Sequence, residues 1–585
     1  MSRNFESFSK EELIEELKKI KKVKKYGLVW EDKTEDIVEK CRTEIPVLNE
    51  IKNKEVFNDV SQPTNLLIEG DNYHALSVLN YTHKEKIDLI YIDPPYNTGN
   101  NDFLYNDKFI DREDSYKHSK WISFINKRLI LAKDLLTKDG SIFVSIDDIE
   151  FPRLLILMED IFGEQNVKTI CIKMSEATGV KMASVIKNGR IPKIKEYLII
   201  AKKNGINNIN LDKIVKSKWD GEYNSIITNV SNDEINIVKE IRDNENRSKN
   251  DVIKIDKILS KWKIKRLYEY YKKEKIDKKK QDDFNYKNAW RIIRTVATSD
   301  GAKKIADIKR QKVKGDFFSV ITPQKKLYLM LKEYNKSGDQ PRIKILLADD
   351  YLTQHPGDIW LDIKTTGLGD EGGVNFKNGK KPLKLLEKII LTNKKKDLTV
   401  LDFFAGSGTT AEAVIKLNSQ DNGLRKFILN TYNDEKENGK IIDEYCYPRI
   451  TNSIKKYKTR DKISTNLKYY KTSFIENKNS DRNKKIISKK IDEIICIKEN
   501  TFKKVFFSNE YKIFKNQNYN TVIIYNPELI PTIINKIKEN NEKYKIYIFS
   551  LNEDTYEDEF IDVIDRVELF CIPDSIMKIY KKIFQ

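Results

Sequence analysis

The sequence predicts an α/β protein whose sheet is built from two separate stretches of the chain. Apolar runs of strand length alternate with helical patterns over residues 65–200. The same alternation returns over 356–450, whereas residues 205–350 are polar and show no such order. Strands that alternate with helices indicate a layered, mostly parallel sheet with helices packed on it.

Five segments follow from this pattern. Residues 1–60 are expected to form a helical and looped lead-in, because SKEELIEELKKIKKVKK at 9–25 has Ser9 as a helix cap and Glu12 as its capping-box partner. The other segments are the two halves of the sheet (61–204 and 355–450), a basic insert (205–354) and a C-terminal domain (451–585). We expect the C-terminal domain, which ends in a small α/β unit, to serve dimer or partner contacts.

Within the sheet, strands and helices follow one another with short connections. The expected strands are 65–70, 86–93, 141–147, 195–203, 398–406 and 425–430, and the expected helices are 121–140, 154–163, 381–391 and 409–417. The run KIDLIYID at 86–93 is mostly apolar, as in a parallel strand that is buried on both faces. The helix 121–140 is amphipathic and is expected to end at Gly140.

The composition limits the class of protein. Apolar residues make up 39% of the 585 residues, and no apolar run reaches the ~18 residues that cross a bilayer, so we expect a cytoplasmic protein. Five scattered cysteines and four scattered histidines form neither a disulfide framework nor a metal-ligand pattern. The net charge is +19, and residues 201–350 hold 36 lysines and arginines against 22 acids. This local excess favours a polyanionic partner such as nucleic acid.

The first motif with chemical meaning is Asp93-Pro94-Pro95-Tyr96, which stands at the end of the buried strand 86–93. Open α/β sheets bind ligands at the carboxyl ends of their strands. The Asp93 carboxylate and the Pro94 carbonyl offer two acceptors for the N–H bonds of an exocyclic adenine amino group, and the prolines fix the backbone that aims them. Tyr96 offers a flat face on which a flipped base can stack, worth ~1–3 kcal/mol. The alternative is a turn that the prolines merely stiffen.

The second motif is a turn of small residues between a strand and a helix. It comprises Asp402, Phe403, Phe404, Ala405, Gly406, Ser407, Gly408 and Thr409. Small residues at such a turn let a cofactor approach the backbone closely. A phosphate-binding Walker A loop would need a lysine after the last glycine, where Thr409 stands, so the motif favours a different cofactor.

With both motifs in view, the sequence resembles amino-group DNA methyltransferases of the β arrangement, in which the catalytic motif precedes the cofactor motif. It resembles more closely the modification (Mod) subunits of Type III restriction–modification systems. The residues that carry the resemblance are KKYGLVWE (24–31), LLIEGDNYHAL (66–76), IDLIYIDPPYNTGNNDFLYND (87–107), EDSYKHSKWISFINKRL (113–129), GSIFVSIDD (140–148), IFGEQN (161–166) and LDFFAGSGTTAEAV (401–414). The insert and the C-terminal domain match mainly in position and size.

The resemblance implies a Rossmann-like, S-adenosylmethionine-dependent methyltransferase core that is interrupted by a basic target-recognition domain. Asp93, Pro94, Pro95 and Tyr96 would form the catalytic pocket. The cofactor would be bound by residues 402–409 together with Asp71 and Asn72, near its adenine end, and Lys381 and Pro382, near its methionine end. One departure is Asn430, which ends the strand 425–430 where such folds usually place a ribose-binding acid; the nearest acids are Asp434 and Glu435.

The reaction expected from the resemblance is site-specific methylation of N6 of a flipped adenine in double-stranded DNA, as part of restriction–modification. The resemblance also implies a homodimer and a restriction subunit with helicase and nuclease activity. Three alternatives stay open: N4-cytosine methylation, an orphan regulatory adenine methyltransferase, and a non-catalytic DNA-binding subunit.

Three further features each have two interpretations. His118 either touches DNA phosphate or supports the pocket structurally. Trp121 is expected to pack in the core, although it lies close to the catalytic motif in the sequence. The run 261–280, in which Trp262 and Tyr268 lie between basic residues, either contacts DNA or forms a solvated helix.

Overall fold

The computed structural model describes residues 9, 28–59, 62–99, 103–106, 108–111, 113–175, 185–207, 209–216, 218–244, 246–334, 341–363, 368–369, 371–376, 380–433, 440–461, 464–476, 487–488, 491–552 and 554–572. The chain forms two compact units. Unit 1 comprises Met1–Leu211 and Gly357–Gln585, and unit 2 comprises Asp212–Pro356, close to the expected insert. Apart from Ser9, the helix predicted at 9–25 lies outside the described residues.

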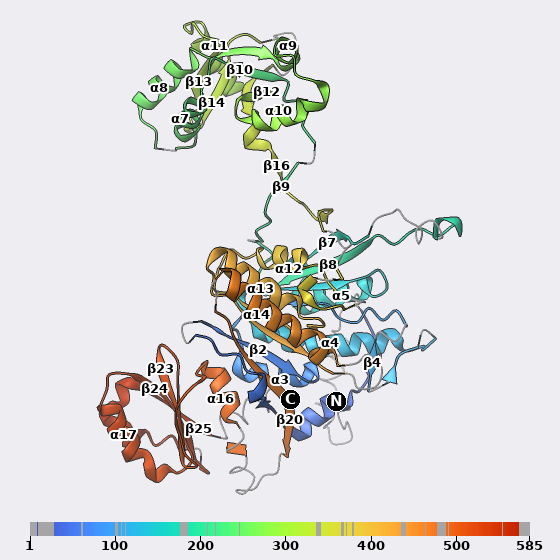
Figure 1. Ribbon diagram of the computed structural model, residues 1–585, viewed down its shortest axis with the longest axis vertical. Helices are drawn as coiled ribbons and strands as arrows, with labels where there is room; N and C mark the ends of the chain where they lie inside the picture. The colour runs from blue at the N-terminus through green and yellow to red at the C-terminus, as the bar shows by residue number, and fades with distance from the viewer. Residues whose placement is uncertain are drawn as a thin grey trace. The chain divides into compact units, whose positions relative to one another are not determined.

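Among the described residues, a ten-stranded sheet forms the centre of unit 1 (Figure 1). Its order is β1-β20-β2-β19-β18-β3-β6-β8-β7-β17. The strands are β1 (Glu44–Glu50), β2 (Thr64–Glu69), β3 (Ile87–Ile92), β6 (Leu136–Ile146), β7 (Val167–Lys173), β8 (Lys195–Lys202), β17 (Ile359–Trp360), β18 (Thr399–Asp402), β19 (Lys426–Thr431) and β20 (Asn466–Glu476). Strands β2, β19, β18, β3 and β6 pair in parallel, and β8 is antiparallel to both β6 and β7. The sheet is therefore the predicted, mostly parallel α/β sheet with two reversed strands, β8 within it and β1 at its edge.

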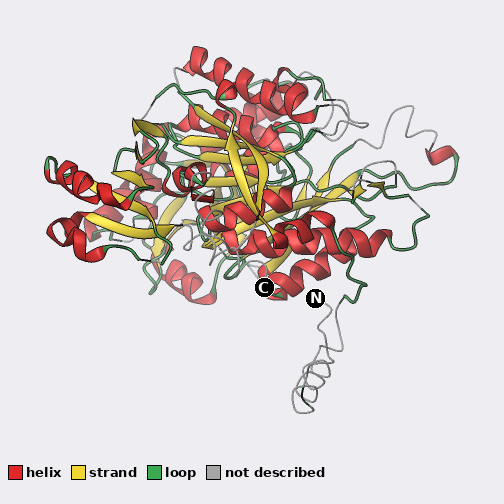
Figure 2. Ribbon diagram, turned by 90° about the horizontal axis from the view of Figure 1, so that it is seen from below, coloured by secondary structure: helices red, strands yellow, loops and turns green. Residues whose placement is uncertain are grey.

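Helices pack on both faces of this sheet (Figure 2). They are α3 (Asn72–Thr82), α4 (Lys117–Leu135) and α5 (Phe151–Phe162) on one face, and α12 (Leu383–Ile390), α13 (Thr409–Asp421) and α14 (Tyr447–Asp461) on the other. Side chains alternate between the faces: Leu66 and Ile68 of β2 join the first core, whereas Leu67 joins the second. Burial on both faces explains why the central strands are almost continuously apolar.

Strands β3 and β18 are neighbours in the sheet although they lie far apart in the sequence. Leu89 pairs with Val400, and Ile90 pairs with Leu401. The chain leaves β3 for α4 on one face and leaves β18 for α13 on the other. Open α/β sheets bind ligands at such a switch point. Both sequence motifs follow these two strands, so the topology brings the motifs together.

Two outer strands extend the sheet beyond the segments predicted to contain it. β1 follows α2 (Asp36–Thr43) within the expected helical lead-in, and it pairs antiparallel with β20. β20 lies within the segment expected to form a C-terminal domain, but it pairs in parallel with β2. The first residues of β20 are buried, so β20 belongs to the central sheet of unit 1. Helix α14 packs on that sheet, and the separate C-terminal fold begins after β20.

One helix boundary differs from the sequence prediction. Helix α4 ends at Leu135, not at Gly140. Leu136 already pairs with Ile87 of β3, and Gly140 lies within β6. Strand pairing in the buried sheet therefore overrides the helical pattern of the last few residues.

Unit 2 is built around a six-stranded antiparallel sheet. Its order is β11-β10-β12-β15-β14-β13. The strands are β10 (Ser225–Thr228), β11 (Lys263–Arg266), β12 (Ile292–Ala297), β13 (Phe317–Ile321), β14 (Leu327–Leu331) and β15 (Arg342–Leu347), and the helices are α7 (Asn232–Asp243), α8 (Lys249–Leu259), α9 (Leu267–Lys273), α10 (Gln281–Lys287) and α11 (Asp300–Arg310). The run 261–280 is thus a strand and a short helix instead of one solvated helix, because Trp262 is buried in the core against Phe317. Tyr268 remains 64% exposed.

The chain enters and leaves unit 2 through a short antiparallel ribbon. β9 (Ile214–Val215) pairs with β16 (Thr353–Gln354). The backbone amide of Lys216 also donates to the carbonyl of Leu352 at 2.9 Å. The two ends of unit 2 are therefore held side by side.

The C-terminal part of unit 1 is a second, smaller α/β fold. Its five strands are β21 (Lys503–Phe507), β22 (Tyr511–Lys515), β23 (Tyr519–Ile524), β24 (Lys543–Phe549) and β25 (Val567–Ile572), paired in that order. Helix α17 (Ile530–Lys538) packs on this sheet, and α16 (Asp492–Glu499) contacts α3 of the larger sheet. Within the part of the chain that the structure describes, no helix combines the length and apolarity that a membrane span requires.

Candidate active site

The Asp93-Pro94-Pro95-Tyr96 motif forms a turn at the carboxyl end of β3. The carbonyl of Pro95 accepts a hydrogen bond from the indole Nε1 of Trp121 at 2.7 Å. Trp121 is fully buried in α4, so it packs in the core as predicted and also fixes this turn. The Tyr96 hydroxyl donates to Oδ1 of Asp93 at 3.0 Å.

A lysine and a second carboxylate complete the cluster around Asp93. Nζ of Lys381, just before α12, lies 3.3 Å from Asp93 Oδ1, 2.5 Å from the Tyr96 hydroxyl and 2.6 Å from Oε2 of Glu196 on β8. The Tyr96 hydroxyl lies 2.9 Å from the same Glu196 oxygen. Lys381 and Tyr96 therefore both bridge the two carboxylates. The contacts described for Asp93 fall on Oδ1, and none among the described residues falls on Oδ2.

Burial raises the pKa of Asp93 to about 6, because the charged form loses its contact with water. The Lys381 ammonium opposes this shift, and the negative charge of Glu196 adds to it. The pKa still lies below neutral pH, so most of the population carries the carboxylate. Asp93 can then act as a hydrogen-bond acceptor.

A buried glutamate supports the residue that follows the motif. Asn97 has a left-handed backbone with φ of 57°. Its Nδ2 donates to Oε1 of Glu150 at 2.5 Å, and Nδ1 of His118 lies 2.5 Å from the same oxygen. Burial raises the pKa of Glu150. His118 thus has the structural contact that was one of its two predicted roles.

The small-residue turn connects β18 to α13. Asp402 is buried at its start and accepts hydrogen bonds from the backbone amide of Phe404 at 3.0 Å and the hydroxyl of Thr410 at 2.6 Å. Burial raises the pKa of Asp402 to about 7. Gly408 has a φ of 80°, and a Cβ there would lie 3.2 Å from the sulfur of Cys446, so both backbone and space favour glycine.

A fully buried arginine from α14 holds the far side of this turn. The guanidinium of Arg449 donates to the hydroxyls of Ser407 at 3.2 Å and Thr409 at 2.7 Å. It also pairs with Glu412 of α13 at 2.8 Å and with Glu371 at 3.4 Å. One side chain therefore fixes the turn against three segments of the chain.

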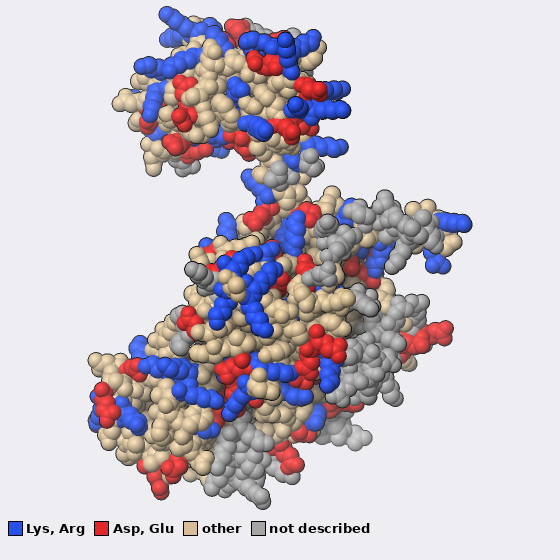
Figure 3. All heavy atoms as spheres, viewed as in Figure 1, with Lys and Arg blue, Asp and Glu red and all other residues tan. Residues whose placement is uncertain are grey.

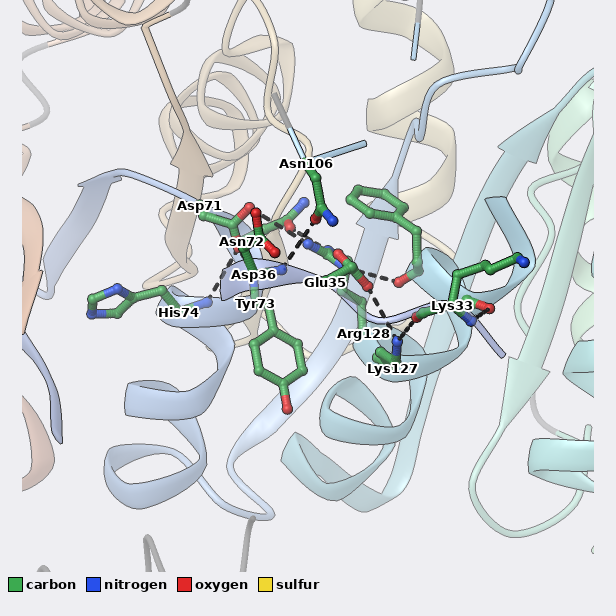
Figure 4. A network of polar contacts seen from close by, with 12 residues as sticks. Lys33, Glu35, Asp36, Asp71, Asn72, Tyr73, His74, Asn106, Lys127 and Arg128 are labelled. Carbon is green, nitrogen blue, oxygen red and sulfur yellow. Dashed lines mark hydrogen bonds and ion pairs between the residues drawn. The ribbon is translucent and has the colours of Figure 1, made fainter. Parts of the chain in front are cut away.

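A second buried arginine, Arg128, holds the start of α3 (Figure 4). Arg128 of α4 donates to Oδ1 of Asn72, to Glu35 at 2.8 Å and to Asp71 at 3.5 Å. Asn72 in turn donates to the carbonyl of Phe403 at 3.2 Å. Asp71 caps α3, and its side chain is 39% exposed. Asp71 and Asn72 are thus tied to the predicted cofactor turn.

The structure brings the predicted site residues into one neighbourhood. Lys381 touches both motifs, because its ammonium contacts Asp93 while its carbonyl lies 3.4 Å from the Thr409 hydroxyl. Pro382 caps α12. The assignment of these residues to cofactor binding stays a prediction.

Sequence reasoning missed Glu196, Arg128 and Arg449. The available signal was weak: each is a charged residue that its strand or helix buries wholly or partly. Such residues require a partner, but the sequence does not say which one.

The fold and this site define the class of α/β enzymes that bind a cofactor at the switch point of a parallel sheet. A family model described as DNA methylase, of the N6/N4 group, matches residues 87–435, more than half of the chain. The chain belongs to this family.

Among curated proteins, the chain is similar to Mod subunits of type III restriction-modification enzymes. The chain is 32% identical over 399 residues to the "Probable type III restriction-modification enzyme HindVI Mod subunit" of Haemophilus influenzae, covering 63% of this chain and 49% of the relative. It is 30% identical over 416 residues to the type III restriction-modification enzyme EcoPI Mod subunit of Escherichia phage P1, covering 64% and 58%. The chain spans about half the length of these relatives.

Solved structures are more distant. The crystal structure of an M1.HpyAVI–SAM complex is 13% identical, with a TM-score of 0.28, and the match covers 66% of this chain and 98% of that one.

Proposed function

We propose that this chain is a DNA methyltransferase that moves a methyl group from S-adenosylmethionine to N6 of adenine. The observation that carries the proposal is the adjacency of the Asp93 turn and the small-residue turn at the ends of paired strands β3 and β18. Membership of the DNA methylase family supports the reaction class. The choice of adenine rests on the similarity to Mod subunits.

Asp93 is the residue proposed to activate the target. An exocyclic amino nitrogen is a weak nucleophile, because its lone pair is delocalised into the ring. The carboxylate accepts a hydrogen bond from one N–H group of this amine and stabilises the positive charge that develops on nitrogen during transfer. The raised pKa of Asp93 also suits it to take up the proton that nitrogen then loses. Tyr96 provides the stacking surface for the flipped base.

The residues around the β18 turn fit a cofactor with hydrogen-bond donors. S-adenosylmethionine, when bound, supplies an electrophilic methyl group on a sulfonium centre. Oδ1 of Asn430, at the end of β19, is buried and has no hydrogen-bond partner among the described residues. Such an atom calls for a donor from a ligand or water. Asp71 offers a partly exposed carboxylate at the start of α3.

Unit 2 is proposed to contact double-stranded DNA and to read its sequence. Lysine and arginine side chains stand on much of its visible surface (Figure 3). A groove of about 720 Å³ on unit 2 is lined by residues that include Asn224, Lys265, Arg266, Lys273 and Arg342. Lysines and arginines contact phosphates, while arginine and asparagine can also pair with base edges in the major groove.

We further propose a homodimer and a restriction subunit as partners. Both come from the similarity to Mod subunits of type III restriction-modification enzymes. Size-exclusion chromatography with light scattering tests the dimer, and co-purification with a neighbouring helicase–nuclease gene product tests the second partner.

The experiment that tests the function is modification-sensitive sequencing of DNA from cells that express this chain or its Asp93→Ala variant. We expect N6-methyladenine at one short motif with the wild-type chain and none with the variant. Asp93→Ala should keep its binding of DNA and S-adenosylmethionine, because Asp93 acts on the target amine. N4-methylcytosine would redirect the assignment of the target base. A purified wild-type chain that binds no S-adenosylmethionine would overturn the proposal.

A further inference from the structure

Two carboxylates compete for one buried lysine in the catalytic cluster. Nζ of Lys381 lies 2.6 Å from Glu196 and 3.3 Å from Asp93. The Lys381 side chain is only 10% exposed, so water screens these contacts weakly. Because the Coulomb attraction falls with distance, Glu196 takes the larger share of the ammonium charge.

This division of charge matters because Asp93 has to act as an acceptor. An ammonium ion that pairs closely with a carboxylate occupies its lone pairs and neutralises its charge. Asp93 would then stabilise less of the positive charge that develops on the target nitrogen. Glu196 is the other carboxylate that the structure places against both Lys381 and the Tyr96 hydroxyl.

We propose that Glu196 is a positioning residue for methyl transfer, which draws the Lys381 ammonium toward itself, shares the Tyr96 hydroxyl with Asp93, and so keeps the Asp93 carboxylate available to the target amino group. The proposal rests on the function proposed above. Glu196 is well placed for this role because its strand, β8, is hydrogen-bonded on both sides, to β6 and to β7. Its backbone is therefore fixed independently of the turn that it serves.

Several charged or titratable groups face Asp93 from the surrounding elements. They are Tyr91 on β3, Tyr96 on the turn, Glu196 on β8, Lys381 before α12 and Asp402 on β18. Of these, Lys381 attracts the Asp93 charge and Glu196 repels it. Loss of the Glu196 charge therefore favours ionised Asp93 by removing a repulsion and by freeing Lys381 to move toward it.

The first test is Glu196→Gln, which keeps the shape of the side chain and removes its charge. Single-turnover methylation is measured at saturating S-adenosylmethionine and DNA across pH. We expect the rate to fall about tenfold or more and the acidic limb of the pH profile to move to lower pH. Binding of both substrates should change little. Glu196→Asp keeps the charge and should keep the acidic limb near its wild-type position, even if its rate falls.

A double variant separates this role from simple structural support. Glu196→Gln combined with Lys381→Gln removes the ammonium that would otherwise pair with Asp93, so it should methylate faster than Glu196→Gln alone. The matched control is Glu164→Gln, the same change at an exposed residue after α5, which should keep the wild-type rate.

Two outcomes would overturn the inference. One is a Glu196→Gln variant with wild-type rate and pH profile. The other is a double variant that, with S-adenosylmethionine shown to be saturating, is as slow as Glu196→Gln or slower, which would mean that Glu196 only supports the fold of the site. A wild-type chain that methylates nothing would instead contradict the proposed function, so the two failures are distinguishable.

Discussion

In the proposed reaction Asp93 must be ionised to accept a hydrogen bond from an amino group, yet its burial favours the neutral acid. The result of these opposing effects is a pKa of about 6. Asp402, on the neighbouring strand β18, has a pKa raised to about 7 for the same reason. The Asp402 carboxylate holds the start of the cofactor turn through Phe404 and Thr410. Asp93 and Asp402 therefore both change protonation state between about pH 6 and 7.

We expect the rate of methyl transfer to fall as the pH drops through about 6. Protonation removes the acceptor, so the single-turnover rate at saturating S-adenosylmethionine should decline about tenfold per pH unit below the Asp93 pKa. As the pH falls, affinity for the cofactor should weaken before the rate does, near pH 7, because Asp402 becomes protonated there. Measuring both quantities from pH 5 to 8 checks the assignment; a rate that stays flat down to pH 5 contradicts it.

At the scale of elements, helix α14 acts as a brace for the predicted cofactor turn, residues 402–409. Arg449 reaches from this helix to Ser407 and Thr409 on the turn, and it pairs with the buried Glu412 of α13. Both charged partners are essentially inaccessible to water. Breaking one half of a buried pair leaves the other half uncompensated, which destabilises a protein more than the loss of an exposed pair.

We predict that Arg449→Met lowers the free energy of unfolding by about 3–5 kcal/mol and weakens S-adenosylmethionine binding. Urea unfolding and isothermal calorimetry measure the two effects. Arg460→Met is the matched control on the same helix, since Arg460 is 54% exposed and, among the described residues, forms an ion pair with its neighbour Asp461 alone. The control should leave both quantities unchanged. Equal effects of the two variants would show that the brace does not depend on Arg449.

The elements of unit 1 could be predicted largely from sequence, because strands that are buried on both faces leave long apolar runs such as 86–93. The two motifs could also be placed at strand ends for this reason. The outer strands β1 and β20 could not, since their pairing joins segments more than 400 residues apart and leaves no local pattern. The same holds for Glu196 and Lys381, which meet only when β8 and α12 pack in one fold.

For the whole molecule, the excess positive charge is concentrated in the segment proposed to contact DNA. Residues 201–350 hold 36 lysines and arginines against 22 acids. Several basic side chains on the unit 2 groove, among them Lys265 and Arg266, are exposed and have no ion pair among the described residues. Such side chains bind phosphates and release condensed counterions, which makes affinity depend on salt.

We predict that DNA affinity falls steeply with salt and that Lys265→Ala with Arg266→Ala flattens this dependence. The logarithm of the binding constant against the logarithm of salt concentration should lose about one unit of slope per phosphate contact removed. The control is Lys394→Ala with Lys395→Ala, two adjacent exposed lysines after α12. If the control flattens the slope as much as the unit 2 pair, the groove is not the DNA-contacting surface.

The ribbon of β9 and β16 has a consequence for how such a chain can change over time. It holds the entry and exit of unit 2 side by side, and the unit begins and ends within a few residues of it. A genetic exchange with both crossovers inside the ribbon would replace the whole of unit 2, the unit proposed to read DNA, and leave every strand pair of the ten-stranded sheet in place. A new target sequence could then be acquired in one recombination event, without passing through an inactive catalyst.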